Sequence, residues 1–270
     1  MYKEIGLCCP ICRLPLTQDN RRLVCRKNHS FDFARQGYIN LLPVQNKHSL
    51  APGDTAAMLH ARRSFLDSGL YLPVSNALCE RITKYARGNI LADIGCGEGY
   101  YTAQTEKNCG CRCIGIDIAK EAAKMACARS KSIVWAVATA SKLPLEDGSA
   151  DIVTAVFSLF MNDEYARILR SGGIVIEITA GNDHLRELKE LIYDEVFVQN
   201  KQPSPCGSQF AAVEQTEETF RFTAEGELLQ DLLLMTPHAH RIKSGRGDPF
   251  EGKDRLSLTA DIIIRVLRKK

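Results

Sequence analysis

Three glycines that alternate with other residues follow directly on a short apolar run that ends near Asp93. They stand at positions 95, 97 and 99, and helix-compatible residues resume after them. Glycine permits positive φ and a close approach of a ligand to the backbone, while the N-terminus of the following helix offers free N–H groups. The pattern therefore predicts a strand, a tight turn and a helix that bind a nucleotide-like cofactor. Its spacing departs from the G-x-G-x-x-G dinucleotide fingerprint, and an ordinary glycine-rich turn is the structural alternative.

A second carboxylate supports a cofactor site. Residues 111–118 form another apolar run, with Asp117 at its end, 24 positions after Asp93. In a βαβ unit, an acid at the end of the second strand is placed to accept hydrogen bonds from both hydroxyls of a ribose. The two acids together are thus more specific for a nucleotide cofactor than either motif alone.

The spacing C-x2-C-x12-C-x3-H joins Cys9, Cys12, Cys25 and His29. Close pairs of ligands at both ends of a short loop are typical of a tetrahedral zinc site. Three thiolates and one imidazole leave no obvious open position, so we expect a structural Zn²⁺ that helps to fold a segment too short to bury much core. Cys8 is the neighbouring thiol, but only Cys9 gives the usual two-residue spacer. Unliganded buried cysteines are the alternative.

The composition is that of an ordinary globular protein. Of 270 residues, 45% are hydrophobic and 25% are charged. No apolar run approaches the ~20 residues of a membrane span, and the N-terminus lacks the apolar core of a signal peptide. Eleven cysteines, an odd number, favour a reducing compartment in which thiols bind metal or pack. We therefore expect a cytoplasmic protein.

The charge is unevenly distributed along the chain. Residues 1–63 carry ten Lys/Arg and four Asp/Glu, a net charge of +6, whereas the remaining residues carry 25 and 28, a net charge of −3. A basic N-terminal segment favours binding to a polyanion, most simply nucleic acid, although a solvated basic face is the alternative. The basic residues around the zinc motif are Arg13, Arg21, Arg22, Arg26, Lys27 and Arg35.

Apolar and amphipathic segments alternate after the second acid, which predicts a Rossmann-like α/β fold with a doubly wound sheet and ligands at the carboxyl ends of its strands. The cofactor would then lie across the loop after Ile94 and beside Asp117. The expected elements are a helix over 119–130, strands over 133–138 and 152–157, a helix over 163–169, a strand over 174–179, and later strands around 220–222 and 256–267.

Two helices are predicted between residues 54 and 86, the first capped by Asp54 and ended by Gly69, and the second started by Pro73. A further amphipathic helix follows Asp183, which fits the N-cap position. Tyr71, between the first two helices, could simply pack them together.

Several motifs in combination carry a resemblance to a known family. The glycine loop DIGCGEGYYT resembles motif I of class I methyltransferases, which bind S-adenosylmethionine (SAM). With the zinc motif and the runs HSFDFARQGYINLLPVQ and PGDTAAMLHARRSFLDSGLYLPV, the chain resembles the bacterial 23S ribosomal RNA (guanine-N1)-methyltransferases. These enzymes join an N-terminal zinc module to a class I methyltransferase domain with a mixed sheet. The match is dense over residues 8–104 and looser beyond them.

The resemblance implies a division of the chain and a set of cofactor-binding residues. Residues 1–45 would form a zinc-binding module that recognises RNA, residues 46–88 a helical linker or lid, and residues 89–270 the SAM-dependent methyltransferase domain. The matching tyrosine and histidine of the family contact the cofactor, although a histidine at a helix start is often a surface residue. The candidate cofactor-binding residues are Tyr71, Asp93, Gly95, Gly97, Glu98, Asp117 and His184.

The segment after the 152–157 strand is where many amino methyltransferases hold the target base. Phe157 and Phe160 could stack on a flipped base or pack in the core. The family that the chain resembles has proline where this chain has Leu159, a departure that bears on target engagement.

The function implied by the resemblance is SAM-dependent methylation of guanine N1 in a hairpin loop of 23S rRNA. Asp163, Glu164 and His184 lie near the expected site, and none is singled out as the general base. The alternatives are a catalytically inactive RNA-binding or ribosome-assembly factor, which Leu159 keeps open, and a small-molecule SAM methyltransferase, which would give the basic zinc module no role. A homodimer would be unsurprising.

Overall fold

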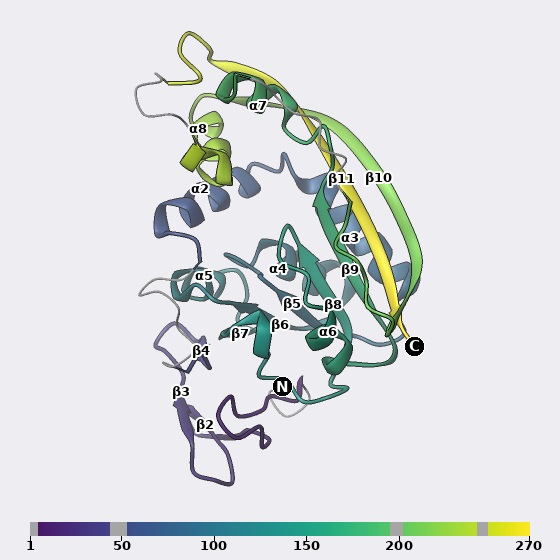
Figure 1. The fold of residues 1–270 in the computed structure, drawn as a ribbon. Helices are drawn as coiled ribbons and strands as arrows, with labels where there is room; N and C mark the ends of the chain where they lie inside the picture. The colour runs from purple at the N-terminus through teal and green to yellow at the C-terminus, as the bar shows by residue number, and fades with distance from the viewer. Residues whose placement is uncertain (1–4, 44–52, 195–201, 242–247) are drawn as a thin grey trace.

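The central sheet is built from the short apolar runs of the sequence. In the computed structural model, which describes residues 5–43, 53–194, 202–241 and 248–270, eight strands lie side by side (Figure 1). In spatial order they are β10 (Phe210–Glu225), β11 (Arg255–Lys269), β9 (Leu169–Ala180), β8 (Ala150–Val156), β5 (Ile90–Ile94), β6 (Arg112–Asp117), β7 (Val134–Val137) and β4 (Ile39–Asn40).

The sheet is mixed, as predicted. β5 pairs in parallel with β6 and with β8, and β6 and β8 extend the parallel pairing to β7 and β9. β11 is antiparallel to both β9 and β10. The long curved strands β10 and β11, which α8 and η3 separate in the chain, run side by side along one edge of the molecule (Figure 1). The strand order reverses between β5 and β8, which is where an open α/β sheet binds ligands.

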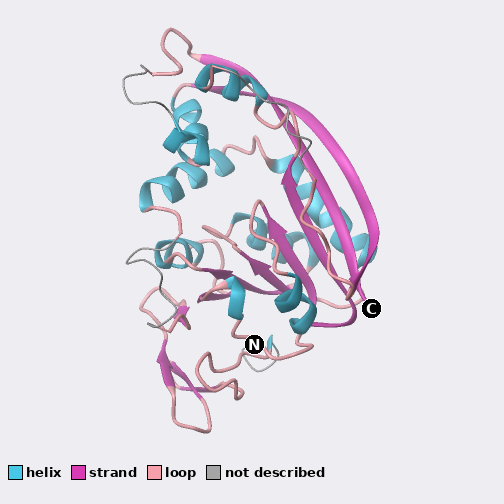
Figure 2. Ribbon diagram, viewed as in Figure 1, coloured by secondary structure: helices cyan, strands magenta, loops and turns pink. Residues whose placement is uncertain are grey.

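Both faces of the sheet are covered, because successive residues of each strand point to opposite sides. Leu91 belongs to one hydrophobic core and its neighbour Ala92 to the other. Figure 2 shows the helices that surround the strands. They are α2 (Ala56–Asp67), α3 (Leu72–Tyr85), α4 (Tyr100–Cys109), α5 (Lys120–Ala126), α6 (Asn162–Ile168), α7 (Arg186–Ile192) and α8 (Glu227–Leu234), with short 3₁₀ helices η2 (Ala140–Lys142) and η3 (Pro237–Arg241).

Two predicted helix caps are wrong. The hydroxyl of Thr55, not Asp54, accepts a hydrogen bond from the N–H of Met58 at 3.3 Å, because the carboxylate of Asp54 is directed instead to Arg62. Asp183 does not cap α7. The helix begins two residues later than that cap requires, because the chain turns through positive φ at Leu185, whose N–H is fixed to a carbonyl of β11.

The zinc motif lies in a small antiparallel sheet of β1 (Thr17–Asp19), β2 (Arg22–Val24) and β3 (Ser30–Asp32). This sheet rests on one face of the central sheet. Leu7, Leu16 and Leu23 are buried in the same core as the apolar residues of α6. β4, which falls inside the N-terminal module expected for residues 1–45, pairs in parallel with β7. The N-terminal segment thus adds an edge strand to the central sheet and packs on one of its faces.

None of the helices in the described ranges combines the length and the hydrophobicity that a transmembrane span needs.

Candidate zinc centre and cofactor cavity

The structure brings together the four residues of the predicted metal site. One ligand atom each from Cys9, Cys12, Cys25 and His29 lies within 4.8 Å of the others. The Cys12 and Cys25 sulfurs are 3.6 Å apart, and His29 Nδ1 lies 3.4 Å from the Cys9 sulfur and 3.5 Å from that of Cys25. A tetrahedral ion with Zn–S bonds of ~2.3 Å spaces its ligands by roughly 3.8 Å. The cluster therefore fits Zn²⁺.

Position separates the metal ligands from their neighbour Cys8. Cys8 lies outside the cluster, and its backbone N–H donates to the Pro144 carbonyl at 3.0 Å. Burial raises the pKa of the Cys8 thiol to about 11, and it also raises the pKa of the ligand Cys9. Burial would raise the pKa of Cys25 as well, but the backbone N–H groups of His29 and Lys27 at its sulfur lower it to about 7.

The glycine loop joins β5 to α4 and has the conformation that its sequence predicts. Gly95, Gly97 and Gly99 all have positive φ, at 78°, 55° and 89°. A Cβ atom at Gly99 would lie 2.7 Å from the Trp135 ring, so this position also requires the absence of a side chain. The loop is thereby held close to the sheet, and α4 begins at its end with no side chain capping its N-terminus.

Asp117 lies at the carboxyl end of β6, beside the glycine loop. Its Oδ2 accepts the N–H of Gly97 at 2.9 Å, and its Oδ1 accepts the N–H of Ala119 at 2.8 Å. Burial raises the pKa of this carboxyl, although both backbone donors oppose the shift. The carboxylate is thus fixed in position and faces the cavity where a ribose would bind.

Asp93 lies beneath the glycine loop and does not contribute to the lining of the cavity. Its side chain is buried, and its two oxygens accept hydrogen bonds from the hydroxyls of Thr102 and Thr154. Burial raises the pKa of Asp93 to about 6, despite these two hydrogen bonds. Of the predicted cofactor residues, Asp93 therefore supports the loop from below.

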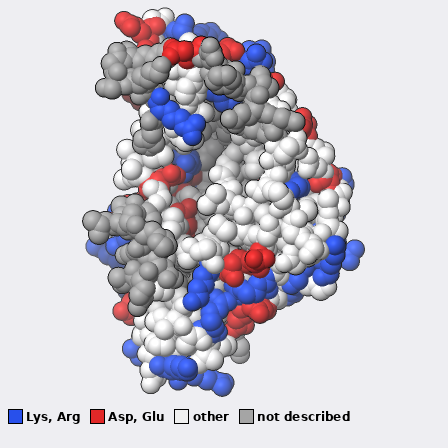
Figure 3. All heavy atoms as spheres, in the orientation of Figure 1, with Lys and Arg blue, Asp and Glu red and all other residues white. Residues whose placement is uncertain are grey.

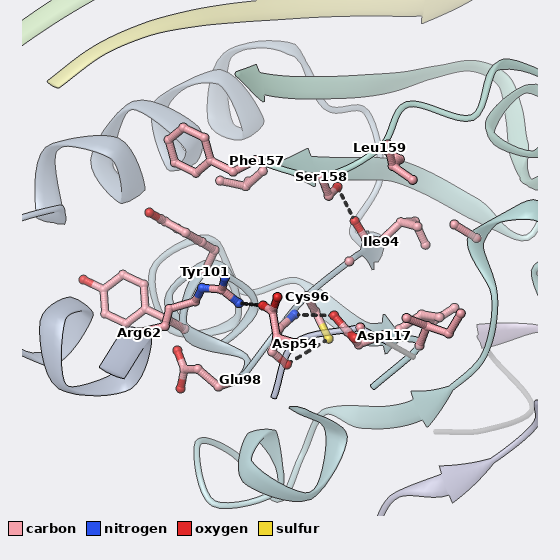
Figure 4. Close-up of a pocket in the computed structure, with 18 of the residues that line it drawn as sticks. Asp54, Arg62, Ile94, Cys96, Glu98, Tyr101, Asp117, Phe157, Ser158 and Leu159 are labelled. Atoms are coloured by element: carbon pink, nitrogen blue, oxygen red, sulfur yellow. Dashed lines mark hydrogen bonds and ion pairs between the residues drawn. The ribbon is translucent and has the colours of Figure 1, made fainter. Parts of the chain in front are cut away.

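A cavity of about 670 Å³ opens at the carboxyl ends of β5, β6 and β8, within the size range of small-molecule sites. Figure 4 shows the glycine loop and Asp117 on one side and Phe157, Ser158 and Leu159 on the other. Predicted residues Tyr71, Gly95, Gly97, Glu98 and Asp117 all line it.

Tyr71 is buried in an aromatic cluster at one wall of this cavity. Its ring packs edge-on against Phe65 and Phe222, and burial raises the pKa of its hydroxyl. His184 does not line the cavity. It is buried behind Tyr71, with Nε2 3.3 Å from the Tyr71 hydroxyl and Nδ1 2.8 Å from the Asp261 carbonyl oxygen. The interpretation of His184 as a surface residue is therefore wrong.

The loop after β8 presents one aromatic side chain to the cavity and buries another. Phe157 has a φ of 51°, is 40% exposed and lines the cavity. Phe160 packs against Tyr165 and Phe210, in the core. Leu159 is 72% exposed at the cavity rim. Phe160 is therefore a core residue, whereas stacking of Phe157 on a base stays a prediction.

The two acids considered as general bases have other partners. Glu164 accepts the N–H of Leu143 at 2.6 Å and pairs with Arg167 at 2.8 Å, and the pKa of its carboxyl is lowered because these contacts outweigh its burial. Asp163 accepts a hydrogen bond from Gln209 at 3.3 Å. Neither lines the cavity. Asp163 and Glu164 are thus close in sequence to the loop after β8 but do not lie at the cavity.

Sequence reasoning missed several cavity residues. Asp54, just before α2, and Arg62, in the middle of α2, form an ion pair at the cavity, and Tyr101 comes from α4. Opposite charges eight residues apart on one predicted helix were a signal for the first pair. Nothing in the sequence distinguishes Tyr101 from a core aromatic residue. Met235 and Pro237 reach the cavity from a distant segment, which only the tertiary fold brings near.

Two family models match the chain, one described as "RlmA, N-terminal" over residues 7–50 and one as "Methyltransferase domain" over residues 92–176. The chain is 36% identical over 189 residues to the 23S rRNA (guanine(748)-N(1))-methyltransferase of Streptomyces fradiae. This alignment covers 68% of the chain and 66% of that relative. It is 33% identical over 201 residues to a protein of Micromonospora griseorubida provisionally named 23S rRNA (guanine-N(1)-)-methyltransferase, with 67% of each covered. The chain belongs to the 23S rRNA (guanine-N1)-methyltransferase family.

Similarity to another relative extends over nearly the whole chain. YxjB of Bacillus subtilis (strain 168), which carries the same provisional name, is 26% identical over 275 residues, covering 96% of this chain and 95% of that protein. By contrast, the alignment to the Streptomyces relative spans about two thirds of that protein.

The sites fit the two groups that such a family uses. The Cys/His cluster has the number, type and spacing of ligands for Zn²⁺. In the cavity, two buried polar atoms have no hydrogen-bond partner among the described residues, namely Glu98 Oε1 and the Tyr101 hydroxyl. Carboxylates of Asp54, Glu98 and Asp117 surround the space, which suits a cationic ligand such as SAM.

Proposed function

We propose that this protein transfers a methyl group from SAM to N1 of a guanine in 23S rRNA. The observation that carries the proposal is the combination of an acidic cavity at the central sheet with a zinc-centred basic module packed against that sheet, in a chain whose relatives are named for this reaction. A small-molecule enzyme would need only the first of these features.

The proposed division of labour follows the chain. Residues 1–45 hold the RNA, residues 46–88 close over the cofactor, and residues 89–270 bind SAM and receive the target base. Within the cavity, Asp117 would accept the ribose hydroxyls and the backbone of Gly95 and Gly97 would contact the cofactor. Glu98, whose Oε1 is buried without a partner, would accept a hydrogen bond from the ammonium group of SAM.

Tyr71 and His184 would form one wall together. The Tyr71 ring lines the cavity, and His184 holds the hydroxyl of that tyrosine from behind. His184 would therefore act on the cofactor through Tyr71.

When bound, SAM supplies an electrophilic methyl group on its sulfonium, and the protein chiefly aligns the nucleophile with it. Guanine N1 lies on the Watson–Crick edge, so the base must be unpaired or flipped out of a helix. Phe157 is the aromatic residue placed to stack on such a base, an interaction worth roughly 1–3 kcal/mol. Tyr101 also lines the cavity, and its buried hydroxyl has no hydrogen-bond partner among the described residues.

The loop after β8 is well fixed, although this chain has Leu159 where the family that it resembles has proline. The Tyr165 hydroxyl donates to the Leu159 carbonyl at 2.8 Å, the Ser158 hydroxyl donates to the Ile94 carbonyl at 2.7 Å, and the Phe157 N–H donates to the Ile178 carbonyl at 2.8 Å. These bonds hold Phe157 in its positive-φ conformation, which is costly for a bulky residue. They support a catalytic role for the loop over a scaffold role.

The proposed substrate has further consequences. A target guanine in a hairpin loop would expose N1 without flipping, which agrees with the preference of RNA-binding proteins for unpaired bases. An rRNA substrate would place the protein in the cytoplasm and give it a role in rRNA processing. A homodimer would add a second basic module to the RNA-binding surface.

The test is methyl transfer from labelled SAM to 23S rRNA that lacks its native modifications. Primer extension and mass spectrometry then locate the product, because a methyl group at N1 blocks Watson–Crick pairing. We expect a single 1-methylguanosine, and none with Asp117→Asn, which removes a ribose acceptor. RNA and SAM binding without transfer would instead support an assembly factor, and turnover of a small substrate without RNA a small-molecule methyltransferase.

A further inference from the structure

Arg62 is the one cation among the described residues that line the cofactor cavity. It projects from α2 towards the glycine loop (Figure 4). A Cβ atom added to Gly97 would lie 3.5 Å from Arg62 Nη1, so the guanidinium lies directly over the loop. Its side chain is 27% exposed, which leaves it partly accessible to a ligand in the cavity.

Two contacts fix the guanidinium at this place. Nη1 forms an ion pair with the carboxylate of Asp54, and Nη2 donates to the Met235 carbonyl at 3.2 Å. Arg62 thereby connects the start of α2 to the segment after α8. These contacts use two of the five N–H donors of the guanidinium, and Nη1, the atom nearest Gly97, carries a second N–H that can donate to an anion above the loop.

The charges of the cavity match those of SAM. SAM carries two cationic groups, the sulfonium and the α-ammonium, and one anion, the α-carboxylate. The cavity has three carboxylates, Asp54, Glu98 and Asp117, and a single cation. A carboxylate buried without a cationic partner is costly, and arginine pairs with carboxylates through two parallel hydrogen bonds.

We propose that Arg62 binds the α-carboxylate of SAM and is the residue by which the protein recognises the amino-acid end of its cofactor. The inference rests on the proposed use of SAM and adds a residue that the glycine motif does not contain. Asp54 holds the guanidinium in place and shares it with the incoming carboxylate. α2 therefore contributes a cofactor ligand of its own.

The N-terminus of α4 is the competing partner for the carboxylate. Its first N–H groups lack a side-chain cap, and a helix N-terminus attracts anions. The two possibilities differ in what the loss of Arg62 does to recognition of the carboxylate.

The probe is decarboxylated SAM, which keeps the sulfonium, the amine and the adenosine but lacks the carboxylate. Affinities of SAM and decarboxylated SAM are measured by isothermal titration calorimetry in the absence of RNA. We expect the wild-type protein to bind SAM roughly ten- to a hundredfold more tightly, as is typical for one charge-assisted contact. Equal binding of the two ligands by the wild-type protein would overturn the inference, and this comparison requires no variant to fold.

Arg62→Gln should remove the preference, so that the two ligands bind within about twofold of each other, mainly through weaker binding of SAM. Arg62→Lys keeps the charge without the planar fork and should show an intermediate ratio. Circular dichroism and zinc content establish that each variant is folded.

Arg63→Gln is the matched control. It removes the same charge from the next position of α2, and Arg63 does not line the cavity. Because Arg63 approaches Glu98 at 3.9 Å, both affinities are free to change, but their ratio should stay at the wild-type value. A full wild-type ratio in Arg62→Gln would contradict the inference and assign the carboxylate to the N-terminus of α4.

These outcomes are separate from those of the methylation experiment. Loss of the SAM preference in Arg62→Gln, in a protein that transfers no methyl group to rRNA, would contradict the proposed function alone. Transfer to rRNA by a wild-type protein that does not discriminate between the two ligands would contradict the Arg62 assignment alone.

Discussion

At the scale of single residues, the site depends on carboxyl groups that the fold buries. Asp93 supports the glycine loop through the hydroxyls of Thr102 and Thr154, and its burial raises its pKa to about 6. Asp117 and Glu98 are also buried, and the pKa of each is raised mainly for that reason. Buried carboxyl groups favour cationic ligands. Their ionisation destabilises the folded protein, because burial penalises the charged form.

Asp93→Asn tests this cost. An acid whose pKa is raised by folding stabilises the folded state at low pH, and this contribution is lost as the pH rises through its folded pKa, here about 6. Relative to the Asn variant, the wild-type protein should therefore lose roughly 1 kcal/mol of stability between pH 5 and pH 7.5. Urea unfolding of both proteins at a series of pH values measures this difference. Parallel stability curves would contradict the assigned pKa, because all other titrating groups are common to the two proteins.

At the scale of elements, the zinc turn is attached to the methyltransferase sheet by hydrogen bonds as well as by apolar packing. Arg13, which follows Cys12, donates to the carbonyls of Leu143 and Leu145 at 2.7 and 3.1 Å. Backbone bonds from Cys8 to Pro144 and from Glu146 to Gly6 extend the contact. The same segment continues from residues 138–141, which line the cavity. Arg13 was expected to be part of a basic surface around the zinc motif, and it instead docks the module onto the sheet.

Arg13→Ala should loosen this contact. We expect a loss of about 1–3 kcal/mol in the free energy of unfolding, as for a hydrogen-bonded charged group. Hydrogen exchange should accelerate in residues 6–16 and 143–146 and stay unchanged in β10 and β11. The control is Arg22→Ala, whose partner Asp19 lies on an exposed hairpin and which should cost under about 1 kcal/mol. Equal effects of the two variants would show that Arg13 does not fasten the module.

At the scale of the whole molecule, the basic residues that remain free for RNA lie at one end. Arg21, Arg26 and Lys27 are exposed on and beside the β2–β3 hairpin, and Figure 3 shows Lys and Arg gathered at this end. Arg22 is paired with Asp19 at 2.6 Å, so it contributes less. Because the zinc module is docked onto the methyltransferase sheet, the position of this basic end relative to the sheet is fixed.

A triple exchange of Arg21, Arg26 and Lys27 for serine should weaken RNA binding and leave SAM affinity unchanged. The slope of log K against log salt should become shallower by roughly two, since each neutralised phosphate contributes about 0.7–0.9. Filter binding to a 23S rRNA hairpin at several salt concentrations measures this slope. The control replaces Arg186, Arg221 and Arg255, which are exposed, are each paired with an acid and belong to α7, β10 and β11, and it should keep the wild-type slope. Figure 1 shows α7 at the opposite end of the molecule from β2 and β3. An unchanged slope in the first triple variant would exclude the hairpin as the RNA-binding surface.

The sequence by itself determined the features that depend on local spacing. The four metal ligands, the positive-φ glycines and the strands and helices between residues 54 and 192 follow from residues close together in the chain, where chelation, turn geometry and periodicity act. The strands of the zinc module and helix α8 were not predicted. The cap expected at Asp54 was wrong because its carboxylate pairs with Arg62. The cap expected at Asp183 was wrong because a hydrogen bond to distant β11 fixes the turn at Leu185, and α7 begins only after it.

Only the tertiary structure decided which of these residues face the cavity. Asp93 and His184 matched the expected pattern but lie one layer behind the lining, whereas Arg62, Tyr101 and Met235 reach it from separate elements. The same holds for Arg13, whose partners are 130 and 132 residues away. Long-range packing sets the direction in which a side chain points, and neither periodicity nor motif spacing contains that information.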